Sequence, residues 1–329
     1  MKDIASLLVF VIILLIFSAN NAIYSQDIEK RKPIYSVSLG GHFGFVHGQS
    51  VELVYPTITN GEFLSELLWN MKPVYYFGVQ VDLGLRDIMS KPGFFTSLAF
   101  KAGIPGDSGI HENRDWMSIE NDSLTHYSKH TIRTNEFYQA DAQIGASIPF
   151  KFFYVKPFIS GSWMRFSFSG RDGYGIYARK KGSNTYYPIH DAPIEYDFSG
   201  MEVIRYEQDW LLIAAGFSIG TNILTPFLVD LSFQISPFTY CAAVDQHFTN
   251  GKTFYDFTGM GLLIEPKGSF TFKWKLMEIS LELNYRYISR TRGDTYIVEK
   301  NSNYAFFYPD EGGAALSMFV TRFAVKVCL

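Results

Sequence analysis

Several segments of this chain alternate strictly between apolar and polar residues, and this pattern restricts the fold more than any other feature. Residues 279–287 read ISLELNYRY, with apolar or aromatic residues at every odd position and polar or charged residues at every even one. Segments 77–85 and 227–235 have the same period. Because successive side chains of a β-strand point to opposite faces, each segment has one apolar and one polar face. The pattern predicts an all-β protein with long strands.

The N-terminus indicates which face of these strands is buried. Lys2 precedes an apolar run at 7–17, and small and polar residues follow that run. This order is typical of a secretory signal peptide, which we expect at 1–25 with cleavage within 22–25; an uncleaved anchor helix is the alternative. An exported chain that ends on an alternating strand, 319–329, is predicted to be a transmembrane β-barrel. Its apolar residues face lipid and its charged residues face the interior.

Ten segments have the character of strands. They are residues 35–55, 65–85, 94–104, 134–148, 151–168, 203–220, 226–245, 254–273, 278–290 and 313–329. Ten is even, as a closed antiparallel barrel requires, and short turns alternate with long polar stretches along the chain. We therefore expect one up-and-down barrel domain over 26–329, in the outer membrane, with long extracellular loops and both termini on the periplasmic side.

Composition narrows the classes of partner. The net charge is −3, which gives no reason to expect a nucleic acid. Aromatic residues make up 17% of the chain, which suits the aromatic girdles of membrane barrels. The two cysteines, Cys241 and Cys328, lie in no CxxC motif, and the chain has no HExxH motif. We therefore expect no metal site.

Two segments at the loop side of the expected barrel contain residue types used in catalysis. One is 111–117 (HENRDWM), in the second long loop, and the other is 244–248 (VDQHF), at the end of the seventh strand. Asp245 and His247 are two residues apart, so both point the same way in an extended chain. A carboxylate beside an imidazole fixes its tautomer and raises its basicity. On these residues alone, an incidental pair in a solvated loop is the alternative.

These segments resemble motifs of the omptin family of surface endoproteases. Residues 244–248 are similar to the family's Asp-Glu-His motif, and 113–117 are similar to its Asp-x-Asp-Trp-Met. Further segments resemble family motifs in the same order, namely 38–40, 48–55, 65–69, 128–130, 165–170 and 206–208. The resemblance therefore touches most of the mature chain.

The resemblance implies a ten-stranded barrel that cleaves peptides in an extracellular groove, through a water that attacks the scissile carbonyl. His247 would be the general base, and Asp245 would orient it. On the opposite wall, Asp115 and Asn113 would position the water. Neither a covalent intermediate nor a cofactor is implied.

The resemblance also implies residues for substrate and lipid. Glu52 matches the acid that receives a basic side chain before the cut, and we assign Ser128 and His130 to substrate binding. Arg165 falls on one position through which the family binds lipopolysaccharide, which makes this lipid a candidate activator, but Asp209 falls on another. The expected partners are outer-membrane lipid and an extracellular peptide or protein, bound by a monomer.

Two departures from the family pattern bear on function. Asn113 stands where the family has an aspartate, and Glu112, one residue away, points to the opposite side of an extended chain. Ala243 stands where the family often has a further acid. The leading hypothesis is an aspartic-type endopeptidase that cuts after Lys or Arg. The alternative is a non-catalytic surface adhesin or receptor, which Asn113 favours; a pore is a third reading, which inward charges disfavour.

Strand parity gives two local predictions. Asp245 and His247 are odd-numbered, like the apolar residues of 227–235, and yet they must face inward. An extra residue near Pro237, which cannot donate to the strand ladder, is therefore predicted to form a bulge. Arg286 is predicted to point into the lumen, between two tyrosines that point outward.

Overall fold

The structure is a computed structural model that describes residues 35–56, 62–85, 92–120, 123–221, 226–300, 302 and 304–329. The predicted signal peptide, 1–25, lies outside the described residues. The part of the chain that is described contains no helix long and apolar enough to cross a membrane.

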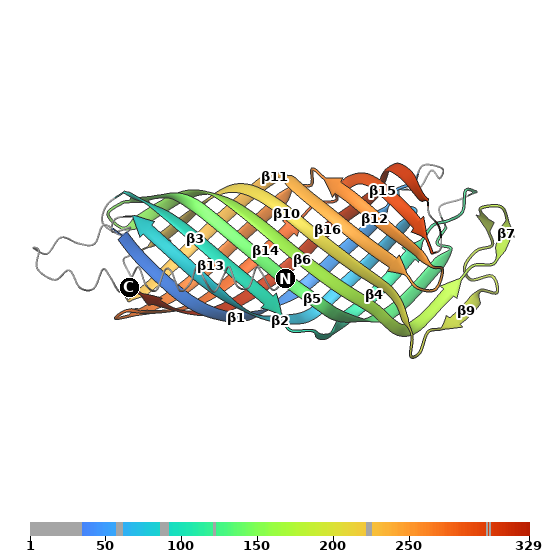
Figure 1. The fold of residues 1–329 in the computed structure, drawn as a ribbon, viewed down its shortest axis with the longest axis horizontal. Coiled ribbons are helices and arrows are strands. Elements are labelled where there is room, and N and C mark those ends of the chain that lie inside the picture. Colours follow the sequence, from blue (N-terminus) through green and yellow to red (C-terminus); the bar gives the residue numbers. More distant parts are fainter. Residues whose placement is uncertain are drawn as a thin grey trace, which may run out of the picture.

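Long antiparallel strands form one closed ring, drawn as an elongated barrel in Figure 1. The strands of the ring are β1 (Tyr35–Val54), β2 (Ser65–Leu85), β3 (Gly93–Gly103), β4 (Gly106–Asp115), β5 (His126–Pro149), β6 (Phe153–Tyr177), β10 (Glu202–Thr221), β11 (Phe227–His247), β12 (Lys252–Gly259), β13 (Leu263–Trp274), β14 (Met277–Ile288), β15 (Arg292–Glu299) and β16 (Ala305–Cys328). The first and last strands pair and close the ring.

The ring has ten positions, which we call staves, in agreement with the ten predicted strands. Three of the staves each consist of two shorter strands placed end to end. β3 and β4 both pair with β2 and β5, so they are successive parts of one stave. The same holds for β13 with β12 and for β14 with β15. The short strands β7 (Lys180–Gly182), β8 (Thr185–Tyr186) and β9 (Ile194–Asp197) project between β6 and β10 at the loop end (Figure 1).

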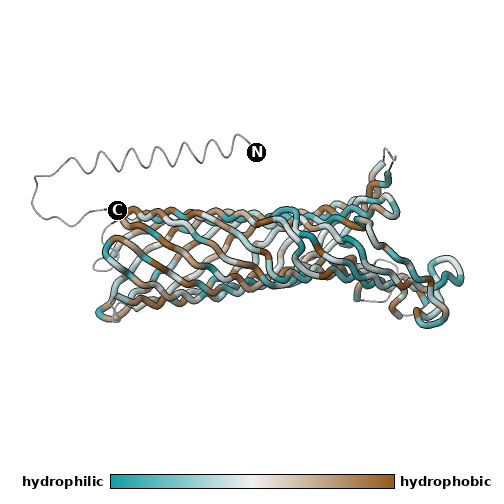
Figure 2. The backbone as a smooth tube through the Cα atoms, turned by 90° about the horizontal axis from the view of Figure 1, so that it is seen from below, coloured by the Kyte–Doolittle hydropathy of each residue, from teal (hydrophilic) through white to brown (hydrophobic). Residues whose placement is uncertain are grey.

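An apolar belt surrounds the half of the barrel that carries the C-terminus. Arg286 points inward and is 2% exposed, whereas its neighbours Tyr285 and Tyr287 point outward and are 41% and 39% exposed. The predicted inversion of the strand faces is therefore confirmed. Figure 2 shows hydrophobic residues along this half and hydrophilic residues at the loop end. We take the belt as the membrane-spanning part, and the strands continue beyond it.

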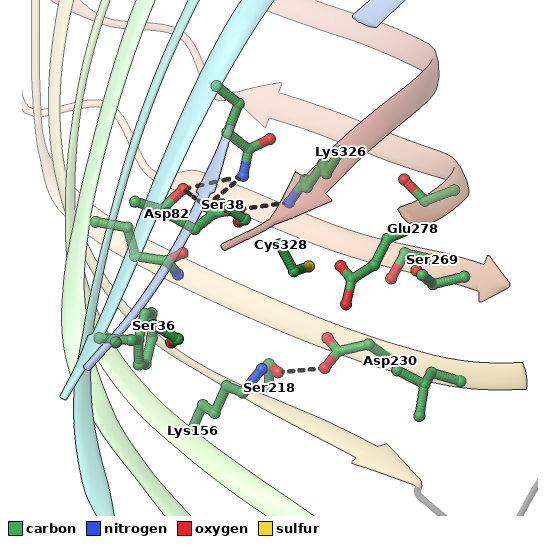
Figure 3. Close-up of a pocket in the computed structure, with 18 of the residues that line it drawn as sticks. Ser36, Ser38, Asp82, Lys156, Ser218, Asp230, Ser269, Glu278, Lys326 and Cys328 are labelled. Carbon is green, nitrogen blue, oxygen red and sulfur yellow. Dashed lines mark hydrogen bonds and ion pairs between the residues drawn. The ribbon is translucent and has the colours of Figure 1, made fainter. Parts of the chain in front are cut away.

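Ion pairs line the lumen inside the belt, mostly between neighbouring strands, and Arg286 of β14 also lies 3.9 Å from Asp141 of β5 on the other side of the ring. Arg286 lies 2.7 Å from Glu265, Arg322 lies 2.6 Å from Glu282 and Lys326 lies 2.6 Å from Asp82. Lys101 lies 3.4 Å from Asp141. Near the C-terminal end, side chains from several strands surround a cavity of about 690 Å³, and Figure 3 shows Asp82, Lys156, Asp230 and Lys326 around it. This cavity is at the end opposite to the loops.

A sealing layer of large buried side chains fills the lumen above these ion pairs. It consists of Trp69, Phe166, Phe168, Tyr206 and Trp210, all of which are fully buried. The ring of Trp69 stacks on those of Phe168 and Tyr206, with centroids 5.6 Å and 5.5 Å away. These packed rings occupy the lumen of the described barrel, which disfavours the pore reading.

The predicted bulge near Pro237 is present in β11. Ile213 of β10 pairs with Phe238, but Ala215, two residues later, pairs with Ile235 three residues earlier. The extra residue on β11 lies at Ser236 and Pro237 and reverses the parity of the strand. Odd-numbered residues face lipid before it and the interior after it.

The predicted loops were too long, and this is a correction. Residues 111–117 were placed in a loop, but up to Asp115 they belong to β4. β5 also begins at His126, before the predicted start at 134, and β6 continues to Tyr177, beyond the predicted end at 168. The reason is that strands beyond the belt are wetted on their outer face, so the apolar alternation that marks a membrane strand is lost.

Candidate active site

The inner faces of β4 and β11 carry the predicted catalytic residues beyond the belt. Asn113 and Asp115 face inward from β4, and Asp245 and His247 face inward from β11 because of the bulge. β5, β6 and β10 lie between β4 and β11 in the ring, so the two strands stand on different sides of the lumen. Asp115 also contributes to raising the pKa of His247. The structure thus brings all four residues to one end of the barrel.

Asp245 and His247 form a hydrogen-bonded dyad. Nε2 of His247 is bonded to Oδ2 of Asp245, and the aspartate is buried. Burial alone would lower the pKa of His247, but Asp245 and, more weakly, Asp115 outweigh it and raise the pKa. An imidazole held in this way accepts a proton readily.

The opposite wall presents one carboxylate and one amide. Ser65 donates to Asp115 at 2.6 Å, and the amide of Asn113 donates to Asp115 at 3.5 Å. Burial raises the pKa of Asp115 to about 6, although Ser65, His247 and Asn113 act in the opposite direction. Glu112 does not replace the missing acid, because its carboxylate binds Arg114 at 2.9 Å on the outer face.

Ser128 and His130 lie beside this wall. On β5 they pair with Asn113 and His111 of β4. His130 contacts the Ser128 hydroxyl at 3.0 Å and the Asp172 carbonyl at 2.5 Å, and burial lowers its pKa. His130 is therefore a neutral, fixed ring. Its partners within the protein hold it in place, so its orientation does not depend on a substrate.

His111 was not predicted as a site residue. Its ring lies between Trp69, at a centroid distance of 4.1 Å, and His130, at 5.7 Å. Burial lowers its pKa well below the ordinary value. The available signal was its position two residues before Asn113, which places it on the same face of β4.

Two further acids, Glu52 and Asp256, lie beyond the belt near the dyad. Asp256, like His111, was not predicted as a site residue. Glu52 faces inward from β1 and Asp256 faces inward from β12; both are buried. Asp256 pairs with Ala243, two residues before Asp245, and its carboxylate lies against Gly312, two residues before Ala314, the partner of Glu52. The three carboxyl groups therefore form one cluster, and Asp245 and Asp256 both contribute to raising the pKa of Glu52. Glu52 was predicted at this place from the resemblance.

Arg165 lies on the outer wall, where carboxylates surround it. Its guanidinium binds Glu136 at 2.9 Å, Glu207 at 2.6 Å and Asp209 at 2.7 Å. All three nitrogens of the guanidinium bind a carboxylate, so the cluster has three acidic groups and one basic group.

The fold and this site define an outer-membrane β-barrel with a polar mouth. The chain matches the model of the Omptin family over residues 33–327, and it belongs to the omptin family. No curated protein sequence matches it.

Two solved structures that are similar to this chain are, by their descriptions, an outer membrane protease and the translocator domain of an autotransporter. The outer membrane protease OmpT from Escherichia coli is 18% identical, with a TM-score of 0.78, over 89% of this chain and 97% of that one. The translocator domain of the autotransporter NalP from Neisseria meningitidis is 10% identical, with a TM-score of 0.35, over 95% of each chain. The first likeness shows that this chain has the barrel fold of the protease.

Proposed function

We propose that this protein is an outer-membrane endopeptidase whose loops are extracellular and which cleaves peptides after basic residues. The observation that carries the proposal is the hydrogen-bonded pair of His247 and the buried Asp245, on the other side of the lumen from Asp115. This arrangement provides a proton acceptor on one wall and a water-binding carboxylate on the other.

In the proposed reaction, a water binds between the two walls and attacks the scissile carbonyl carbon. His247 takes a proton from this water, and Asp245 stabilises the imidazolium that forms. Asp115 accepts the second hydrogen bond of the water and orients it. When the carbon–nitrogen bond breaks, His247 returns its proton to the leaving amine. The dyad thus serves first as base and then as acid.

Lipopolysaccharide is not required in this proposal. The support is the environment of Arg165, whose three carboxylate partners leave no free positive charge for a phosphate group. Hydrolysis by the purified barrel should therefore be the same with and without lipopolysaccharide.

The proposal is tested with a fluorogenic peptide that contains two adjacent arginines, offered to the refolded barrel. Hydrolysis is expected from the native protein and should fall by about 10²–10⁴-fold in His247→Ala. His190→Ala, which removes an exposed histidine, is the matched control and should retain full activity. Activity that survives in His247→Ala would contradict the assigned base.

Asn113 supports a second candidate, a non-catalytic surface adhesin or receptor, because it removes one charge from the water-binding wall. If the native protein and Asn113→Asp are both inert on Arg and Lys peptides, with and without lipopolysaccharide, this second function replaces the first.

A further inference from the structure

The acid cluster of Glu52, Asp245 and Asp256 lies against a stretch of wall with very small side chains. The three residues are 2%, 1% and 3% exposed. Between β1 and β12 in the ring lie β16 and β15. Ala314 of β16 pairs with Glu52, and Gly312 is two residues away on the same strand. Ala314 and Gly312 have small side chains or none, so neither residue places a large side chain between Glu52 and Asp256.

Asp256 extends toward β1 across this stretch of wall. It pairs with Thr295 of β15, which donates to it at 2.6 Å. A Cβ atom at Gly312 would lie 2.9 Å from Oδ1 of Asp256, so the carboxylate occupies space that only a glycine leaves free. On its other side Asp256 pairs with Ala243, whose side chain is only a methyl group.

The cluster has more acceptors than donors. Among the described residues, Oε2 of Glu52 and Oδ1 of Asp245 have no hydrogen-bond donor, and no lysine or arginine of that part forms an ion pair with the three acids. Burial and the neighbouring acids raise the pKa of Glu52 well above its ordinary value, and burial raises that of Asp256 to about 7. Buried carboxylates without a cation are costly.

We propose that Asp256 acts with Glu52 to bind the guanidinium of an arginine side chain of the substrate. The inference rests on the proposed function, since the bound arginine would precede the bond that the dyad attacks. Two carboxylates from different strands suit a guanidinium, which presents several donors in a planar fork. The unpartnered Glu52 oxygen would then receive a donor. Asp256 is a specificity-determining residue in this proposal and takes no part in the proton transfers.

The test uses two peptides that differ only at one position, arginine or citrulline, which has the same shape without the charge. Asp256→Asn keeps an oxygen acceptor for Thr295 and removes the charge. Asp294→Asn is the matched control. It makes the same change on the neighbouring strand β15, on the face opposite to that of Thr295, and it keeps the acceptor for the Asp310 amide. Values of kcat and KM are measured for both peptides, and binding is measured by calorimetry in the His247→Ala background.

The native barrel is expected to prefer the arginine peptide, in cleavage and in binding. Asp256→Asn should reduce this preference by about thirtyfold or more, mainly through KM, and leave citrulline peptide cleavage within about threefold. Asp294→Asn should change neither. A preference that is unchanged in Asp256→Asn, while the peptides are still cut, overturns the inference and leaves the proposed function intact.

The opposite failure gives a different result. If neither peptide is cut, but the barrel binds the arginine peptide in preference and loses that preference in Asp256→Asn, the proposed reaction is wrong and the arginine site stands. If the His247→Ala barrel binds both peptides equally, the site assigned to Asp256 is wrong.

Discussion

The side-chain amide of Asn113 donates to the carboxylate of Asp115 across 3.5 Å, where a second carboxylate would repel it. In Asn113→Asp, the two acids would therefore share a proton or compete for the water, and the pKa of Asp115 would rise further above about 6. The water would gain a second anionic acceptor. We expect kcat/KM at alkaline pH to increase and its acid limb to move to higher pH. Unchanged activity and an unchanged profile would show that position 113 does not contact the water.

The native pH profile should have its acid limb above pH 6.5. His247 accepts a proton only when it is neutral, and Asp245 raises its pKa above the ordinary value of 6.5 despite burial. The neutral form is therefore lost as the pH falls through a value higher than 6.5. Asp115, with a pKa of about 6, is already ionised there. The measurement is kcat/KM from pH 5 to pH 9, in steps of about half a unit, with stability checked at each pH.

Asp245→Asn separates orientation of the base from its presence. The substitution keeps the shape of the side chain and removes the charge that raises the pKa of His247. We expect kcat to fall by about 10²–10⁴-fold and the acid limb to move to lower pH. A fall in activity without any movement of that limb would show that Asp245 does not control the titration of His247.

Arg286 tests the arrangement inside the belt. Its guanidinium is buried and binds Glu265 at 2.7 Å. Arg286→Ala would leave a buried carboxylate without its partner, which costs about 3–5 kcal/mol of unfolding free energy. Arg290→Ala, which removes a largely exposed pair with Glu62, should cost about 1 kcal/mol or less. Urea unfolding in lipid vesicles measures both, and equal effects would contradict an inward Arg286.

Deletion of Pro237 tests the bulge. Without the extra residue, Asp245 and His247 would turn to the outer face, and hydrolysis should be lost as completely as in His247→Ala. Pro237→Ala keeps the residue count and should retain activity, which separates an effect of parity from an effect of proline. If the deletion variant folds and remains active, the bulge does not position the dyad.

The strands inside the membrane could be predicted from the sequence because lipid imposes a strict alternation, as in 279–287. The bulge could be predicted from the same alternation, because Asp245 has the parity of the lipid-facing residues of 227–235 and can face inward only if the strand contains an extra residue. Beyond the belt the outer face is wetted, and residues such as Glu112 and Arg114 are charged on that face, so β4 was taken for a loop. Asp256 was missed because its significance depends on pairing with Ala243 and Thr295, and such register is not contained in any local pattern.

The sealing layer around Trp69 and Tyr206 also decides which solution the proton acceptor samples. These packed rings lie between His247 and the ion pairs of the belt, so His247 is on the side of the layer that carries the loops. In the proposed orientation, this side faces the medium outside the cell. The acidity of that medium, rather than that of the compartment behind the membrane, would then set the fraction of His247 that is neutral and able to accept a proton.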